Sequence, residues 1–225
     1  MSNSPKVKNL GRRPPSPKPQ KKNPASLLIL ISAPSGGGKT TLCRQLLRAR
    51  RNLMRAVTCT TRPPRKGERN GVDYHFLKAE DFLRRVQAGN FIEHATVYGN
   101  SYGILKSELL GKLRAGKDVL LNVDVQGAAT ISRRAESEPE LKCALVTIFL
   151  TPTSLAEIEA RLNRRGADSP ETIRRRVAAA KQEIAQWRSF DYLLVSSTKQ
   201  EDLRRTLAII EAEKMRVNRS QAPEF

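Results

Sequence analysis

The chain has 225 residues, of which 39% are hydrophobic, and a formal net charge of +19. This length supports one substantial core with room for smaller inserted lobes, and it argues against a second independent domain. The positive charge favours polyanionic partners, and a nucleotide and a nucleic acid would both satisfy it. No apolar run comes near the roughly 18 residues that a membrane span requires, so no membrane partner is expected. The three cysteines are odd in number and widely spaced, which argues against a disulfide framework and against a zinc knuckle.

Residues 1–24 differ in composition from the rest of the chain. They contain seven Lys or Arg, no acidic residue and six of the thirteen prolines. Such a segment cannot bury a core, so it is predicted to be a disordered basic tail. It lacks the apolar stretch of a secretory signal, and a cytoplasmic location is expected. The tail leaves nucleic-acid binding open as a second property of the chain.

A glycine-rich stretch at residues 33–40, APSGGGKT, lies between an apolar run and a helical pattern. The apolar run 27–31 predicts a buried parallel strand, and leucines spaced over 42–47 give the following segment one apolar helical face. Strand, loop and helix in this order are the context that a P-loop requires. Ala33 stands where the strict pattern has its first glycine, and the alternative is a structural glycine turn before a helix.

The residue types of this stretch suit the binding of a nucleoside triphosphate. Glycines let backbone N–H groups converge on phosphate oxygens without a Cβ in the way, and the helix N-terminus adds the positive end of its dipole. Lys39 would reach the β and γ phosphates, and Thr40 would be a ligand of Mg²⁺. The predicted ATP-binding residues are Ala33, Pro34, Ser35, Gly36, Gly37, Gly38, Lys39, Thr40 and Thr41.

A basic turn follows a short predicted strand. Residues 56–60 are rich in β-branched side chains, which favours a strand. Two prolines and a glycine in residues 61–68 exclude a helix, so Arg62 and Arg65 are predicted to lie on a turn with a restricted backbone. Such a turn suits a preorganised anion clamp, although a solvated basic loop fits the same residues.

The next segment alternates predicted strands with a helix. Residues 71–76 alternate like a strand, and residues 78–88 predict a helix with Phe82, Leu83 and Val86 facing inward. Then Glu93 follows two apolar residues and precedes a turn rich in tyrosine and glycine. This pattern is interpreted as the wall of a pocket, and an exposed acidic strand residue is the alternative.

The second half of the chain alternates apolar runs with helical patterns. Runs at 118–124, 145–150 and 192–195 predict buried strands, and the first ends in polar residues at the edge expected to face a nucleotide. Strands separated by helices with right-handed crossovers predict a doubly wound, three-layer α/β fold with a parallel central sheet. Residues 198–217 predict a final helix, and its inward residues are Leu203, Leu207, Ile210 and Met215.

Six arginines flank a short glycine-containing turn within residues 161–176. Ser169 and Pro170 are the predicted N-cap and first residue of a helix that begins after this turn. The arginines would form either a mobile lid that closes on a triphosphate or an ordinary solvated surface. They are Arg161, Arg164, Arg165, Arg174, Arg175 and Arg176.

Four blocks of sequence together resemble the guanylate kinase family. They are SAPSGGGKT at 32–40, TTRPPRKGERNGVDYHF at 60–76, FIEHATVYGNSYG at 91–103 and NVDVQG at 122–127. The second and third blocks are far more specific than a P-loop, which many unrelated NTPases carry. The resemblance extends over about residues 27–216, and it implies a P-loop NTPase fold with an inserted nucleoside-monophosphate (NMP) lobe and a helical lid.

The resemblance also implies a division of the chain. A guanylate kinase-like domain would occupy residues 25–225, with its core at 25–54 and 106–225. The NMP-binding lobe would lie at about 55–105 and the lid at about 161–176.

Roles for individual residues follow from the same resemblance. Matching positions imply that the acceptor phosphate is held by Arg62, Arg65, Tyr74 and Tyr102, and that the guanine base is read by Thr58, Glu93 and Asp124. The implied catalytic residues are Lys39, Arg161, Arg165 and Arg176, and the implied metal ligands are Thr40 and, through water, Asp124.

Three positions depart from the pattern of the family. Asn122 stands where the family usually has an acidic residue, and Ile104 stands where a small hydroxyl residue usually helps to bind the base. Ser196 replaces the asparagine on the adenine side. These departures concern metal binding, acceptor affinity and donor selectivity more than the type of reaction.

The resemblance therefore implies a cytoplasmic enzyme of purine nucleotide metabolism, a monomer or homodimer, that phosphorylates GMP to GDP with ATP and Mg²⁺. One alternative is a phosphokinase of the same fold that acts on another small acceptor. A second is a guanylate kinase-like module that has lost catalysis and binds proteins, which the intact Lys39 and Thr40 argue against. Nucleic-acid or ribosome binding through the basic tail is a third.

Overall fold

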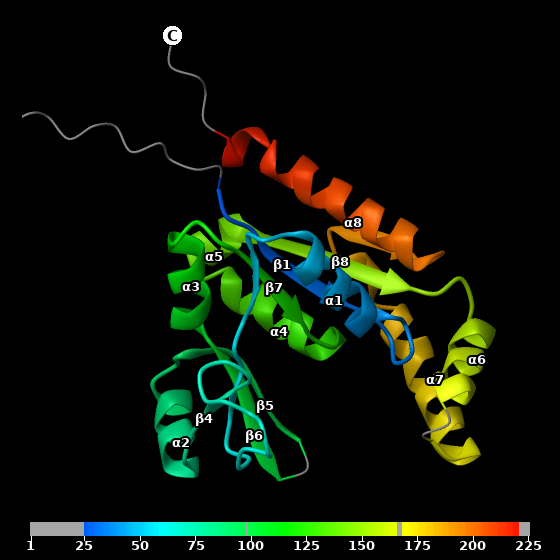
Figure 1. The fold of residues 1–225 in the computed structure, drawn as a ribbon, viewed down its shortest axis with the longest axis horizontal. Coiled ribbons are helices and arrows are strands. Elements are labelled where there is room, and N and C mark those ends of the chain that lie inside the picture. Colours follow the sequence, from blue (N-terminus) through cyan, green and yellow to red (C-terminus); the bar gives the residue numbers. More distant parts are fainter. Residues whose placement is uncertain (1–24, 98, 166–167, 221–225) are drawn as a thin grey trace, which may run out of the picture.

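The computed structural model describes residues 25–97, 99–165 and 168–220, in which helices surround two β-sheets (Figure 1). The predicted disordered tail, residues 1–24, lies outside the described residues. No helix in the described ranges is long and apolar enough to cross a membrane.

The larger sheet has five strands in the order β2-β7-β1-β8-β9, and all its neighbouring strands are parallel. Its central strand, β1, is buried over its whole length because helices cover both faces of the sheet. This sheet confirms the predicted α/β class. The strands are β1 Leu28–Ser32, β2 Leu53–Arg55, β7 Asp118–Asn122, β8 Leu145–Thr151 and β9 Tyr192–Val195.

Alternate residues of β1 face two different cores, which is why the domain has three layers. Ile29 and Ile31 belong to a core with α1 (Lys39–Ala49) and α8 (Lys199–Lys214). Leu28 and Leu30 belong to a core on the other face, where helices α3, α4 and α5 pack. These three helices are Lys106–Arg114, Val125–Ala135 and Pro139–Ala144.

The smaller sheet has four strands in the order β4-β3-β6-β5, and it lies below the larger sheet in Figure 1 together with α2 (Ala79–Gln87). The strands predicted over 56–60 and 71–76 are shorter than expected. Gly71 has a φ of 76° and its N–H bonds to Tyr74, so the chain turns before the second strand begins. The four strands are β3 Cys59–Thr60, β4 His75–Phe76, β5 Phe91–Val97 and β6 Asn100–Leu105.

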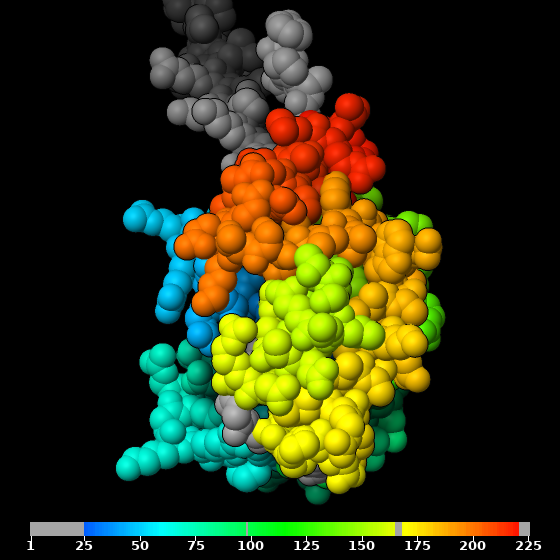
Figure 2. Space-filling view, turned by 90° about the vertical axis from the view of Figure 1, so that its right-hand side faces the viewer, coloured from blue at the N-terminus to red at the C-terminus, as the bar shows by residue number. Residues whose placement is uncertain are grey.

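Helices α6 (Leu155–Arg165) and α7 (Pro170–Ile184) form a pair at one side of the molecule. Ile158 and Leu162 of α6 pack against Ile173 and Ala180 of α7, in a small core separate from those of the large sheet. Figure 2 faces this side, where the yellow surface of the pair lies beneath the orange surface of α8. The predicted cap is confirmed, because Ser169 Oγ accepts the Thr172 N–H at 3.2 Å and Pro170 begins α7. Two 3-10 turns, Trp187–Ser189 and Val217–Arg219, complete the described elements.

One strand was missed, and three expectations about these elements were wrong. Strand β2 was not predicted, because only Leu53 of its three residues is buried and the others give no periodic signal. Strand β9 was expected to be buried, but only Leu194 of its four residues is, because β9 lies at the edge of the sheet. Leu83 is 56% exposed, since α2 buries Phe82 against the Phe91 ring. Met215 is 71% exposed because α8 ends at Lys214.

Candidate active site

The loop between β1 and α1 has a geometry that only glycine permits. Gly36 and Gly38 have φ angles of 82° and 96°, in the left-handed region. A Cβ on Gly37 would lie 2.9 Å from both the Ala33 Cβ and the Pro34 carbonyl oxygen, so a side chain there is excluded. Ala33 is 4% exposed, and its methyl group occupies the space that Gly37 leaves free. The backbone N–H groups of the loop are thus accessible to a ligand without a neighbouring Cβ.

Lys39, the first residue of α1, reaches from this loop to the end of β7. Its Nζ donates a hydrogen bond to the carbonyl oxygen of Val123 at 2.6 Å. Burial lowers the pKa of Lys39, and the nearby charge of Asp124 acts in the opposite direction. The two sequence-predicted residues Lys39 and Asp124 are therefore close together.

Asp124 has a structural role as well as its predicted functional ones. Its Oδ1 accepts the Gly127 N–H at 2.7 Å and caps the N-terminus of α4. The side chain is nonetheless exposed, as are Asn122 at the end of β7 and Thr40 in the first turn of α1. Candidate ligands for a hydrated cation therefore lie on the carboxyl edge of the large sheet.

The turn after β3 holds a basic cluster on the small sheet. Arg62 donates to both oxygens of Glu68, at 3.0 and 2.9 Å, and its guanidinium lies 5.3 Å from the centre of the Tyr74 ring. The centres of the Tyr74 and Tyr102 rings are 6.3 Å apart. Arg62 lowers the pKa of Glu68, which also accepts the backbone N–H of the exposed Arg65 at 2.7 Å. Sequence reasoning missed Glu68, although its place at the end of the basic turn was a usable signal.

Glu93 lies on β5 of the small sheet, where charges of other elements act on its carboxylate. Burial raises the pKa of Glu93, the negative charge of Asp124 raises it further, and Arg134 opposes both. Thr58 is half-buried just before β3, and its carbonyl oxygen accepts the His75 N–H at 2.9 Å. Ile104 is 6% exposed within the core that contains Ile92, which explains why an apolar residue is stable there.

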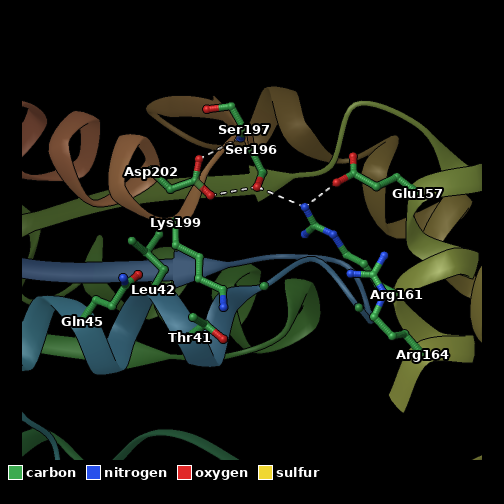
Figure 3. Close-up of a pocket in the computed structure, with 12 residues that line it drawn as sticks. Thr41, Leu42, Gln45, Glu157, Arg161, Arg164, Ser196, Ser197, Lys199 and Asp202 are labelled. Carbon is green, nitrogen blue, oxygen red and sulfur yellow. Dashed lines mark hydrogen bonds and ion pairs between the residues drawn. The ribbon is translucent and has the colours of Figure 1, made fainter. Parts of the chain in front are cut away.

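A cavity of about 490 Å³ extends from the glycine-rich loop along α1 to the start of α8 (Figure 3). Arg161 of α6 lies at its wall and donates to Glu157 at 2.5 Å, to the Gly37 carbonyl oxygen at 3.4 Å and to Ser196 Oγ at 3.4 Å. The lining residues are Gly36, Gly38, Thr41, Leu42, Gln45, Glu157, Arg161, Arg164, Ser196, Ser197, Lys199 and Asp202.

The predicted lid arginines fall into different environments. Arg161 lies over the loop, and Arg164, expected only as a surface or nucleic-acid candidate, also lines the cavity. Arg176 instead forms an ion pair with Asp168. The Arg165 side chain lies outside the described part of the structure. Of the two predicted catalytic arginines whose side chains the structure describes, Arg161 lies at the loop and Arg176 is paired with Asp168.

Comparison with known proteins identifies the family. The family model for guanylate kinase matches residues 25–213. A guanylate kinase of Clostridium perfringens is 40% identical over 198 residues, which cover 88% of each chain. One from Alkalilimnicola ehrlichii is 42% identical over 185 residues, 82% of this chain and 86% of the relative. The crystal structure of guanylate kinase from Anaplasma phagocytophilum is 32% identical, has a TM-score of 0.63, and matches over 88% of this chain and 90% of its own. The chain belongs to the guanylate kinase family.

Proposed function

We propose that this chain transfers the γ-phosphoryl group of ATP to GMP, giving ADP and GDP. The observation that carries the proposal is the geometry of the loop after β1. Gly36 and Gly38 have left-handed backbone conformations, and Lys39 Nζ reaches the Val123 carbonyl oxygen at 2.6 Å, next to Asp124 in the chain. The charge of Asp124 also acts on the half-buried Glu93 of the small sheet. Nucleotides bound on the two sheets would therefore both lie near Asp124.

The donor would bind with its phosphates on the glycine-rich loop. Lys39 then leaves the Val123 carbonyl oxygen and places its charge on the transferring phosphoryl group. Such a reaction needs alignment of the reacting groups and neutralisation of charge, and an acceptor that is already an anion needs no strong general base. Arg161 would move from Glu157 onto the phosphates as the α6–α7 pair closes, with Arg165 and Arg176 following as the lid.

Mg²⁺ is the cation that this site fits. The described residues contain no group of three His, Cys, Asp or Glu that could hold a metal. Mg²⁺ usually keeps several waters and takes few protein ligands, with phosphates supplying the rest. Thr40 and, through water, Asp124 would hold it. Bound there, the ion would neutralise charge on the β and γ phosphates.

The acceptor would bind on the small sheet, within the proposed NMP lobe. Arg62 and Arg65, with the hydroxyls of Tyr74 and Tyr102, supply donors for a dianionic phosphate. Glu93 can accept two parallel hydrogen bonds from N1–H and the exocyclic amine of guanine, while Thr58 donates to O6. Adenine offers no such pair of donors to a carboxylate, so the site selects GMP over AMP.

The remaining expectations are also proposals. We propose a cytoplasmic enzyme, active as a monomer or homodimer, in which the basic tail contributes nucleic-acid affinity and takes no part in catalysis. The chain would divide into a core, the lobe at about residues 55–105 and the lid at about 161–176.

The decisive experiment measures ADP release from Mg·ATP with GMP, AMP, CMP and UMP offered in turn. GMP is expected to be preferred over AMP in kcat/KM by roughly 10⁴-fold, because a mismatched base leaves the half-buried Glu93 carboxylate unpaired. Faster phosphorylation of another monophosphate would identify a kinase with a different acceptor. Absence of ADP release with all four would contradict the proposed activity.

A further inference from the structure

Strand β5 carries one extra residue immediately before Glu93. In the antiparallel pairing of β5 with β6, Phe91 lies opposite Leu105 and Glu93 lies opposite Ile104, so β5 advances two residues where β6 advances one. Ile92 is the extra residue, and this arrangement is a β-bulge. Because side chains of a strand alternate between its two faces, one extra residue reverses the face of every residue that follows.

The bulge decides which face of the small sheet Glu93 lies on. Phe91 stacks its ring on Phe82, in the apolar core beside α2. Without the extra residue, Glu93 would share the face of Phe91 and enter that apolar core. With it, Glu93 lies directly opposite Ile104, on the face that belongs to the core beneath the large sheet. The bulge therefore keeps the Glu93 carboxylate out of the apolar core beside α2.

Arg134 of α4 holds the backbone at this bulge. Its Nη1 donates to the carbonyl oxygen of Phe91 at 3.0 Å, across 43 positions of sequence. β5 is an edge strand of the small sheet, and α4 packs against it (Figure 1). Backbone groups at a bulge are less well paired than those of a regular ladder, so a charge-assisted bond there fixes the local conformation.

The charge of Arg134 also acts on Glu93. Burial and the Asp124 charge raise the pKa of Glu93, and Arg134 lowers it. Burial lowers the pKa of His94, the next residue of β5, and Arg134 lowers it further. The positive charge that faces Glu93 from α4 is thus opposed by the negative charge of Asp124 at the start of the same helix.

A second cation lies near Arg134 but is already paired. Lys106 of α3 lines the same cavity of about 220 Å³ as Arg134 and His94, and its Nζ bonds to Glu138 at 2.7 Å. Among its described hydrogen bonds, Arg134 binds only the Phe91 backbone. Its charge is therefore not taken up by a carboxylate within the described part of the chain.

We propose that Arg134 is a positioning residue for the acceptor base. It clamps the β5 bulge through the Phe91 carbonyl oxygen, so that the Glu93 carboxylate is directed at the base, and its charge favours the ionised form of that carboxylate. Arg134 lies outside the four blocks of sequence that resemble the guanylate kinase family. This role rests on the proposed function, in which Glu93 reads guanine.

The test compares GMP with inosine monophosphate, which lacks the exocyclic amine and so offers Glu93 one hydrogen bond instead of two. ADP release is measured at saturating Mg·ATP with each acceptor varied. The wild-type chain is expected to favour GMP in kcat/KM by about tenfold or more, since hydrogen bonds to a charged group are strong. Arg134→Met removes the bond to Phe91 and the charge, so this preference should fall toward one while the KM for ATP stays nearly unchanged.

Two further variants separate the role of Arg134 from a loss of charge or of packing. Arg134→Lys keeps a cationic donor and should restore most of the preference for GMP. Arg133→Met, at the neighbouring exposed position of α4, removes one positive charge and should keep the wild-type preference. Circular dichroism establishes that each variant is folded. If Arg134→Met does not fold, Arg134→Gln, which keeps a polar group at this half-buried position, takes its place.

The pH profile is a readout that weakened packing alone would not move. As pH falls, kcat/KM for GMP should be lost at a higher pH in Arg134→Met than in the wild-type chain, because the variant lacks the charge that lowers the pKa of Glu93. Arg134→Lys should keep the wild-type profile. An unmoved profile in Arg134→Met would overturn the electrostatic part of the role.

The outcomes separate the inference from the proposed function. A folded Arg134→Met variant that keeps the wild-type preference for GMP over inosine monophosphate overturns the role of Arg134 alone. A wild-type chain that uses both acceptors equally overturns the reading of the amine by Glu93, and the role of Arg134 with it. A wild-type chain that releases no ADP with GMP overturns the proposed function and this inference together.

Discussion

The carboxylate of Glu183 on α7 accepts a hydrogen bond from the backbone N–H of Ser35 at 3.1 Å, across 148 positions of sequence. Glu183 also raises the pKa of Lys39, against the effect of burial. The helix that carries Arg176 is therefore tied to the phosphate-binding loop. A movement of α7 relative to the loop would therefore change this contact.

Removing the Glu183 bond is expected to weaken donor binding selectively. Hydrogen bonds to charged groups contribute about 1.5–3 kcal/mol, so Glu183→Ala should raise the KM for ATP roughly tenfold or more and leave the KM for GMP nearly unchanged. Glu183→Gln keeps a hydrogen-bond acceptor, so its KM for ATP should lie between those of the wild-type chain and Glu183→Ala. Glu171→Ala, an exposed carboxylate in the first turn of the same helix, is the control. Equal increases in both KM values would indicate a general loss of structure instead.

Lys39→Met is expected to reduce kcat by about 10²-fold or more, because it removes a preorganised donor from the transferring phosphoryl group. The variant should unfold at the same temperature as the wild-type chain or higher, since the burial that lowers the Lys39 pKa penalises the charge. Single-turnover kinetics and thermal unfolding measure the two effects. Lys181→Met, at an exposed position on α7, controls for loss of one positive charge. A folded Lys39→Met variant with wild-type kcat would refute the role of this lysine.

Asn122→Asp is expected to lower the Mg²⁺ concentration that gives half-maximal rate. Asn122 is exposed at the end of β7, and a hard cation prefers an anionic oxygen even through a water. Titration of Mg²⁺ at fixed ATP and GMP measures the effect, with the exposed Asn218→Asp as the control. Superimposable titrations for wild type and Asn122→Asp would exclude an influence of this position on the metal.

Glu93→Gln is expected to raise the KM for GMP strongly and the KM for ATP little. Glutamine keeps the volume but loses the charge and accepts through one oxygen, so one of two charge-assisted bonds is lost. Steady-state kinetics with each substrate varied distinguish the two effects. An unchanged dependence on GMP would mean that another residue reads the base.

The pH dependence of GMP binding gives a second test of Glu93. Burial and the Asp124 charge raise the pKa of Glu93, so the carboxylate becomes protonated at a higher pH than an ordinary glutamate, and affinity for GMP is lost as pH falls through that pKa. Asp124→Asn retains a side chain able to cap α4 but removes one cause of the shift. The loss of affinity should therefore move to lower pH in this variant. A profile that does not move would show that Asp124 has no electrostatic influence on Glu93.

Local sequence determined the phosphate-binding loop, the buried strands β1, β7 and β8 of the large sheet, and the start of α7. In each case the signal lies within a few neighbouring residues, because glycines set the backbone of a turn and a strand buried on both faces is continuously apolar. Ser169 and Pro170 show the same principle, since a helix cap is a local hydrogen bond. The basic turn with Arg62 was predicted as a turn for the same reason, but its partner Glu68 was not.

Tertiary structure alone decided which charged groups meet. Parallel strands align their carboxyl ends at one edge of the sheet, which brings Lys39 beside Asp124 although 84 positions separate this lysine from its bonding partner Val123. The bonds from Ser35 to Glu183 and from Ser196 to Asp202 also depend on how α7 and α8 pack against the sheet. No periodic or compositional pattern encodes such contacts, because each side chain by itself is an ordinary helix residue. A short stretch of sequence was therefore enough to identify the phosphate-binding loop. Which charged and polar side chains lie around that loop, and which of them bond to one another, was decided by the tertiary structure.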